Sequence, residues 1–201
     1  MLIIGLTGGS GCGKGYVAKL LAKEGIMSID TDAVYHDMCF RGTPCMQELE
    51  GHFGSGIFLA GGALNRKALG DIVFADMKKL TLLNQITHKY ILAKCERWLE
   101  LCRSCGDYAA VIDAPVLFES GFDKHCDFIV SVIADREERI KRITSRDNIT
   151  KTAAEARING QKSKEFYIEN SDYILYNNDS DRIERQCAAL AAELRRKSGT
   201  V

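Results

Sequence analysis

Short apolar runs recur along the chain and alternate with longer amphipathic stretches. The runs cover residues 2–6, 26–29, 108–112, 128–133 and 173–176, and the stretches between them are long enough to form helices. This alternation predicts an α/β fold, because parallel strands need right-handed crossovers that lay helices on both faces of the sheet. In such sheets ligands bind at the carboxyl ends of the strands, so functional residues are expected directly after each run.

The second and third runs are about eighty residues apart, much farther than the others. This gap contains segments rich in helix formers, such as MKKLTLL at 77–83, and therefore predicts a helical insertion. We expect one globular unit over residues 1–201, divided into three parts. They are a core of 1–35, 106–145 and 163–201, an insertion of 36–105, and a lid of 146–162.

The composition narrows the classes of partner and compartment. The chain has 27 basic and 27 acidic residues, so its mean charge gives no reason to expect a nucleic acid partner. No stretch approaches the roughly 18 to 20 consecutive apolar residues of a membrane helix, and the first residues lack the pattern of a signal peptide. We expect a soluble, cytoplasmic protein with no membrane partner; the sequence does not indicate its oligomeric state.

The eight cysteines are interpreted as reduced thiols, since a chain of 201 residues can fold without disulfides. Cys102 and Cys105 form one CxxC pair, but no second pair stands at the spacing of a zinc site. We interpret this pair as a coincidence on a helix surface.

A glycine-rich segment follows the first apolar run directly. It reads GGSGCGK over residues 8–14 and leads into the helical pattern GYVAKLL, which fits GxxxxGK between a strand and a helix. Glycines let backbone N–H groups converge on phosphate oxygens, and the helix N-terminus adds partial positive charge. The segment therefore predicts a nucleotide site in which Lys14 contacts the β- and γ-phosphates.

The residue after Lys14 departs from this motif, which normally has Ser or Thr there. Gly15 has no hydroxyl to bind Mg²⁺, and the phenol of Tyr16 is expected to point elsewhere. Water can fill the missing coordination position, or metal affinity and turnover can be reduced.

Carboxylates follow the second and third runs. Asp30 and Asp32 come after the second and Asp113 after the third, where carboxylates can orient an attacking hydroxyl or hold Mg²⁺. We take Asp32 as the candidate base and Asp113 as an outer-sphere metal holder. Asp30 is the better candidate for capping a helix that begins near Ala33.

Arginines follow the fourth run. Arg139, Arg142 and Arg146 are spaced to share a helix face, from which guanidinium groups can stabilise charge on a transferred phosphoryl group. Asp135 is expected to supply the N-cap of this helix. A second polar helix carries Arg157 and Gln161, and the pair of helices predicts a lid that closes over ATP.

Taken in order, these segments resemble the dephospho-coenzyme A kinases over most of the chain. Singly, only the glycine-rich loop is specific; together and in this order they would be hard to obtain in another family. Three positions depart from the family pattern: Gly15 replaces Ser, Lys89 replaces Pro, and Arg139 replaces Gln. The matching segments are GLTGGSGCGK at 5–14, IDTD at 29–32, GGALNR at 61–66, LNQITH at 83–88, DAPVLFE at 113–119, RITSRD at 142–147 with Arg157 and Gln161, and SDYILYNN at 171–178.

The resemblance implies a P-loop nucleoside triphosphate hydrolase-type fold of three α/β/α layers, with a five-stranded parallel sheet, a helical substrate-binding insertion and a helical lid. It implies transfer of the γ-phosphoryl group of ATP, with Mg²⁺, to the ribose 3′-hydroxyl of dephospho-coenzyme A. The catalytic residues would be Lys14, Asp32 and Arg142. The nucleotide would lie against Gly9, Ser10, Gly11, Cys12, Gly13, Lys14, Gly15, Tyr16, Arg146 and Asn177, with Asn177 near the adenine. The acceptor would contact Thr7, Asp32, Arg66, His88, Asp113, Arg157 and Gln161.

Two alternatives stay open. Because of Gly15, the chain can be a nucleotide-binding relative with weak or no kinase activity. It can also be a nucleoside or nucleotide kinase, since one core serves many acceptors. For His88 itself, the alternative to a ligand contact is a packed histidine.

Overall fold

The computed structural model describes residues 1–179 and 182–199, and its contacts divide the chain into two compact units. The first unit holds Met1–Ile29 and the residues from Leu99 onward, and the second holds Asp30–Trp98. The sequence predicts a helical insertion over residues 36–105. In the structure the helical unit begins six residues before, and ends seven residues before, these predicted bounds.

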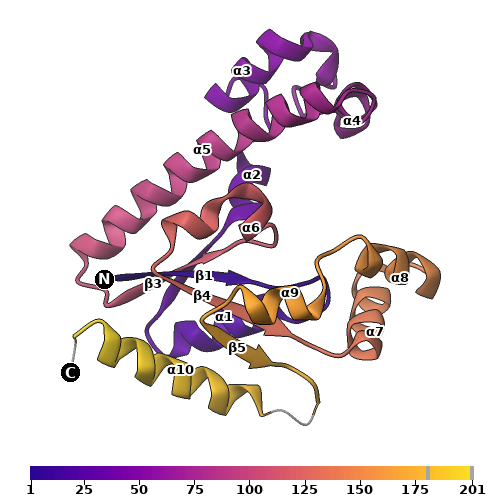
Figure 1. Ribbon diagram of the computed structural model, residues 1–201. Helices are drawn as coiled ribbons and strands as arrows, with labels where there is room; N and C mark the ends of the chain where they lie inside the picture. Colours follow the sequence, from indigo (N-terminus) through magenta and orange to yellow (C-terminus); the bar gives the residue numbers. More distant parts are fainter. Residues whose placement is uncertain (180–181, 200–201) are drawn as a thin grey trace. The chain divides into compact units, whose positions relative to one another are not determined.

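The first unit is built on a five-stranded sheet with the strand order β2-β3-β1-β4-β5 (Figure 1). Its β1 pairs with β3 and β4, and β4 pairs with β5, all in parallel. Each strand begins and ends within one residue of its predicted run, so the sheet prediction is confirmed. The strands are β1 Leu2–Thr7, β2 Met27–Asp30, β3 Ala109–Asp113, β4 Phe128–Ile133 and β5 Tyr173–Tyr176.

Helices cover both faces of this sheet. Alternate residues such as Ile4 and Leu6 are fully buried in a core shared with α1 (Lys14–Lys23) and α10 (Ile183–Lys197). Gly5, between them, faces the other way, where a Cβ atom would meet the side chain of Leu117 at 2.8 Å. That second face carries α6 (Leu117–Ser120), η2 (Phe122–His125) and α9 (Lys164–Glu169), so the three-layer α/β/α prediction is also confirmed.

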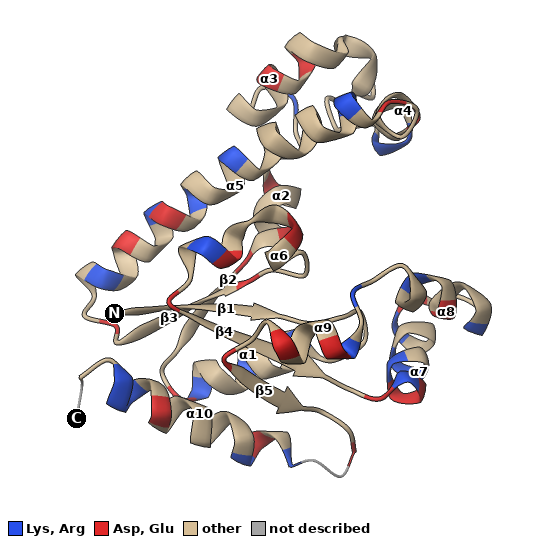
Figure 2. Cartoon of the chain, in the orientation of Figure 1, with Lys and Arg blue, Asp and Glu red and all other residues tan. Residues whose placement is uncertain are grey.

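Two further helices form a hairpin after β4. They are α7 (Arg136–Asp147) and α8 (Lys151–Asn159), which pack through Ile140, Ile143, Ala154 and Ile158. Lys and Arg positions are frequent on both helices (Figure 2). The lid expected over 146–162 comprises the end of α7, all of α8 and the turn before α9, and its closure stays a prediction.

The second unit is helical. It contains α2 (Thr31–Met38), α3 (Pro44–Phe53), η1 (Ser55–Ile57), α4 (Arg66–Val73) and most of α5 (Met77–Ser104). Side chains cap the N-termini of α3 and α4. Thr43 accepts a hydrogen bond from Met46 N at the start of α3, and Asn65 accepts one from Ala68 N at the start of α4. The carboxylate of Glu48 joins α3 to α5 by accepting hydrogen bonds from Lys89 and Tyr90.

All eight cysteines are free thiols, as predicted. The interpretation of the CxxC pair was wrong in one respect, since Cys102 is buried and only Cys105 is exposed. Among the described residues no group of His, Cys, Asp or Glu is arranged to hold a metal ion. Over the same residues, no helix combines the length and apolar character needed to cross a membrane.

Candidate functional site

The phosphate loop, residues 8–14, lies between the carboxyl end of β1 and the start of α1. Two of its glycines are required by the geometry. Gly8 and Gly13 have φ of 140° and 94°, and added Cβ atoms would clash with the carbonyl oxygen of Val132 and with Asn177 Nδ2. Helix α1 begins at Lys14 without a side-chain cap, which leaves its first N–H groups directed at the loop. This is a cradle for an anion.

The lysine and the cysteine of the loop have different roles. The Lys14 ammonium donates to the carbonyl oxygen of Gly8 at 3.3 Å and is only half-buried, so it lies over the loop. The Cys12 side chain is buried in the core, and this burial raises the pKa of its thiol. Cys12 therefore offers a nucleotide only its backbone.

Asn177, expected near an adenine, is placed directly after β5. Its side chain is buried and donates through Nδ2 to the carbonyl oxygen of Cys12 at 2.8 Å. In this structure it holds the phosphate loop against the sheet.

Gly15 and Tyr16 occupy the first turn of α1 on its exposed side. A Cβ atom added at Gly15 would meet no described atom within 4 Å, so a larger side chain fits there. The Tyr16 phenol donates to Glu184 of α10, and this hydrogen bond raises the pKa of the phenol. Tyr16 therefore points to α10 rather than replacing the missing hydroxyl.

The carboxylates at the strand ends are in contrasting settings. Asp113 is the last residue of β3 and is buried. Asp30 caps α2 by accepting hydrogen bonds from the backbone N–H groups of Asp32 and Ala33, so α2 begins at Thr31, two residues before the predicted start. Asp32, in the first turn of that helix, is exposed.

Thr7 ends β1 and is fully buried. Its hydroxyl has no hydrogen-bond partner within the described part of the chain. A buried hydroxyl beside the phosphate loop can accept or donate a hydrogen bond to a ligand.

Two arginines of α7 reach the phosphate loop. Arg139 donates through Nε to the carbonyl oxygen of Ser10 at 2.9 Å, and Arg142 lies 3.5 Å from that of Gly11. Burial lowers the pKa of the Arg139 guanidinium from its ordinary value, although an arginine stays charged. Gln161 joins them, because its Oε1 accepts from Ser10 N at 2.9 Å and from Arg139 Nη2 at 2.7 Å.

Arg146 and Arg157 share one carboxylate partner. Both donate to Asp147, and these hydrogen bonds hold the pKa of the Asp147 carboxyl well below its usual range. Arg146 is thus paired with its neighbour in sequence, whereas Arg139 and Arg142 contact the loop, and the binding of nucleotide by Arg146 stays a prediction.

The prediction that Asp135 supplies the N-cap of α7 is confirmed for its position only. Asp135 occupies the N-cap position, but its carboxylate makes no capping hydrogen bond and instead lies 3.9 Å from Lys164 Nζ. The sequence pattern could not distinguish the two, because the competing lysine belongs to α9.

Asp32, Arg66 and His88, which the sequence predicts to contact the acceptor, belong to the helical unit. Arg66 lies over the ring of Tyr35, 5.7 Å from its centroid, and both line a mainly apolar cavity of about 390 Å³. His88 is half-buried on α5, and this burial lowers its pKa, which favours the neutral imidazole. Sequence reasoning missed this cavity, whose other walls include Leu69, Val73, Phe74 and Leu83.

A comparison with protein families gives the decisive result. The model of the dephospho-CoA kinase family matches residues 2–182. The chain belongs to the dephospho-CoA kinase family. It is therefore a kinase, a transferase with a P-loop nucleotide-binding fold, and the family acts in coenzyme A biosynthesis.

Individual relatives agree with this assignment to the dephospho-CoA kinases. The dephospho-CoA kinase of Corynebacterium efficiens is 35% identical over 195 residues, covering 96% of this chain and 98% of the relative. That of Symbiobacterium thermophilum is 38% identical over 190 residues, covering 94% and 80%. Among solved structures, the Thermus thermophilus protein TT1252 superposes with a TM-score of 0.81 at 29% identity, covering 96% of this chain and 97% of that one.

Proposed function

We propose that this chain transfers the γ-phosphoryl group of ATP to the ribose 3′-hydroxyl of dephospho-coenzyme A, giving coenzyme A and ADP. The observation that carries the proposal is the phosphate loop between β1 and α1, with Lys14 at the first position of the helix. The loop, the lysine and the arginines of α7 are the groups that phosphoryl transfer needs for positioning and charge stabilisation.

The donor phosphates are held by backbone N–H groups of residues 8–14 and by the start of α1. Lys14 and Arg142, both half-buried at the loop, oppose the charge on the transferring phosphoryl group. Cationic groups placed before the reaction lower its barrier, because they need no reorganisation as charge develops.

The acceptor side is assigned to the helical unit. We assign Asp32 as the base that takes the proton of the 3′-hydroxyl. Its side chain is exposed in the first turn of α2, where a substrate hydroxyl can come within the hydrogen-bond reach that a general base needs. Arg66 and the cavity beside Tyr35 would hold the remainder of the acceptor, with one cation among apolar walls.

The residues fit a hydrated Mg²⁺ ion rather than one bound directly by several side chains. Asp113 offers a buried carboxylate at the end of β3, whereas Gly15 offers no side-chain oxygen, and Mg²⁺ usually retains several waters. When bound, the ion neutralises part of the negative charge of the phosphates. Asp113 would hold it through water.

The test is Mg²⁺-dependent conversion of dephospho-coenzyme A and ATP, with the product identified by mass. We expect coenzyme A in equal amount to ADP, and we expect Lys14→Met to abolish product while the protein remains folded by circular dichroism. A panel of nucleosides and nucleotides serves as the acceptor control. If any of these compounds were phosphorylated faster than dephospho-coenzyme A, that compound would be assigned as the acceptor instead.

A second candidate function rests on Gly15 alone. Without a hydroxyl at this position, the chain would bind nucleotide and acceptor but transfer phosphate slowly or not at all. ATP binding without product in the wild type, together with product from Gly15→Thr, would favour this candidate.

A further inference from the structure

Arg139 and Gln161 together hold both backbone polar groups of Ser10, in the middle of the phosphate loop. Gln161 Oε1 accepts from the Ser10 N–H at 2.9 Å, and Arg139 Nε donates to the Ser10 carbonyl oxygen at 2.9 Å. Arg139 Nη2 also donates to Gln161 Oε1 at 2.7 Å, which closes the arrangement. We call these two side chains the clasp.

The glycines of the loop make this approach possible. A Cβ atom at Gly9 would clash with Arg139 Nη2, and one at Gly11 would lie 2.7 Å from the backbone oxygen of Arg139. Both the guanidinium and the backbone of α7 thus lie directly against the loop. The clasp is a fitted contact rather than a chance meeting of two exposed side chains.

One oxygen atom, Gln161 Oε1, accepts from two donors that suit a phosphate. A loop N–H and a guanidinium N–H converge on it, and that pair of donors is typical of anion sites in proteins. A phosphate oxygen is the stronger acceptor for both, since its hydrogen bonds are charge-assisted. The position of Gln161 Oε1 therefore marks where an oxygen of the bound nucleotide belongs.

We propose that nucleotide binding exchanges Gln161 Oε1 for a phosphate oxygen, so that Gln161 is a positioning residue that competes with the nucleotide, and Arg139 is a further phosphate-binding residue. The inference rests on the proposed binding of nucleotide phosphate by the loop. Gln161 returns to Ser10 when phosphate leaves, and so links the turn after α8 to the occupancy of the loop.

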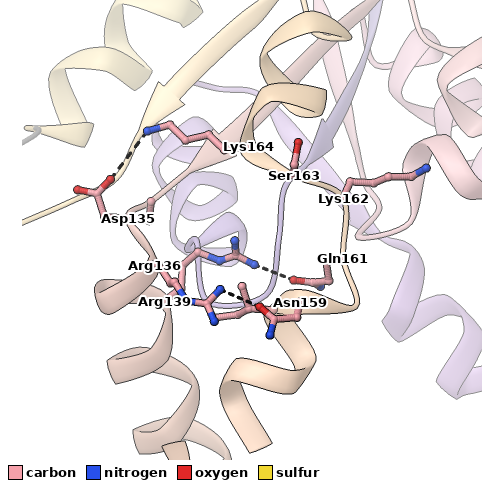
Figure 3. A pocket seen from close by; sticks show the side chains of 10 residues that line it. Asp135, Arg136, Arg139, Asn159, Gln161, Lys162, Ser163 and Lys164 are labelled. Carbon is pink, nitrogen blue, oxygen red and sulfur yellow. Dashed lines mark hydrogen bonds and ion pairs between the residues drawn. The ribbon is translucent and has the colours of Figure 1, made fainter. Parts of the chain in front are cut away.

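The surroundings leave room for this exchange. Arg139 and Gln161 line a cavity of about 330 Å³ between the start of α7 and residues 158–164 (Figure 3). We expect Gln161 to withdraw into this cavity when phosphate binds. Arg139 keeps its hydrogen bond to the Ser10 carbonyl oxygen while Nη2 turns to phosphate.

The same cavity is lined by a matched pair of residues that hydrogen-bond to each other. Arg136 Nη1 donates to Asn159 Oδ1 at 2.9 Å, from the same helix and the same connecting segment (Figure 3). These two residues repeat the chemistry of the clasp, a guanidinium on an amide oxygen, and provide its controls.

The experiment measures the dissociation constant of ADP with Mg²⁺ by calorimetry for wild type and variants. Gln161→Ala removes the competitor, so the loop is free in every molecule and ADP binds about three- to tenfold more tightly, the range expected for one hydrogen bond. Arg139→Gln removes a charged donor, and ADP binds at least about tenfold more weakly. Arg136→Gln and Asn159→Ala leave the dissociation constant within about twofold of wild type.

The clasp predicts that Gln161→Ala strengthens ADP binding and that Arg139→Gln weakens it. A purely structural role for the two residues predicts that both substitutions weaken ADP binding. Thermal unfolding of each variant is recorded, and Gln161→Met replaces Gln161→Ala if the latter unfolds. If the wild type binds ADP and either Gln161 variant binds it more weakly, the proposed exchange at Gln161 is wrong but the proposed function still stands. A wild-type chain that does not bind ADP overturns the proposed function as well.

Discussion

Asp30 and Asp135 show how far single residues can be interpreted before a structure is known. An Asp at or just after the end of a strand is a common helix cap, and Asp30 makes that contact within three residues of itself. Asp135 stands in the same pattern but pairs with Lys164, nearly thirty residues away in another helix. Local hydrogen bonds follow from sequence, whereas a competing partner from a distant element does not.

At Gly15 we predict a gain of function on substitution. Gly15→Thr should lower the Mg²⁺ concentration for half-maximal activity by about tenfold, an effect typical of groups that support a bound metal. The space is free, since an added Cβ meets no described atom within 4 Å. Activity titrated against Mg²⁺ at saturating ATP measures the effect.

The control for this prediction is Gly15→Ala. Alanine stabilises the helix relative to glycine by up to about 1 kcal/mol and adds a Cβ, but it supplies no oxygen ligand. Equal Mg²⁺ dependence of the Ala and Thr variants would mean that helix stability, not the hydroxyl, causes any gain.

Among the elements, the α7–α8 hairpin combines a small apolar core with a charged junction. Ile143 and Ala154 are fully buried between the helices, while Asp147 accepts hydrogen bonds from Arg146 of its own helix and Arg157 of the next. The apolar spacing predicts two packed helices. It does not predict which arginine turns to the loop, because Arg142 and Arg146 share one face and only Arg146 has an adjacent aspartate.

The Asp147 junction gives a pH prediction. Its folded-state pKa is depressed, first by Arg146 and then by Arg157. The stability it contributes is therefore present above the unfolded-state pKa of about 3.9 and is lost as the pH falls through the folded-state value. We expect Asp147→Asn to lower the Tm at pH 7, and the difference from wild type to shrink below about pH 4.

Thermal unfolding of both proteins between pH 7 and pH 3 measures this difference. Glu155→Gln is the control, since Glu155 forms a surface pair with Lys151 at 3.9 Å and such pairs contribute little. A Tm difference for Asp147→Asn that stays constant down to pH 3 would show that the effect is not electrostatic.

Across the whole molecule, the sheet could be predicted from the sequence, but the contacts around the phosphate loop could not. Five apolar runs set the strands to within one residue, because buried parallel strands need continuous apolar sequence. The contacts of Asn177 with Cys12 and of Gln161 with Ser10 join residues 165 and 151 positions apart. Such contacts depend on how the chain returns to the sheet, and no local pattern records them.

The division into two units leads to a last prediction, which concerns where each ligand acts. The phosphate loop, Arg139 and Arg142 belong to the sheet unit, whereas Arg66 and the cavity beside Tyr35 belong to the helical unit. Hydrogen exchange should therefore report the two ligands separately. ADP should protect residues 8–16 and the α7–α8 hairpin, and dephospho-coenzyme A should add protection in α2, α4 and the first turns of α5.

Arg66→Ala distinguishes acceptor binding in the helical unit from a general tightening of the protein. Arg66 is exposed at the start of α4, so its loss should leave the fold and the ADP-dependent protection unchanged while removing most of the acceptor-dependent protection. Leu69→Ala, which opens the apolar wall of the same cavity, should weaken the acceptor effect without abolishing it. Acceptor protection that stays confined to the sheet unit in wild type would move the acceptor site to that unit and leave the cavity beside Tyr35 without a ligand.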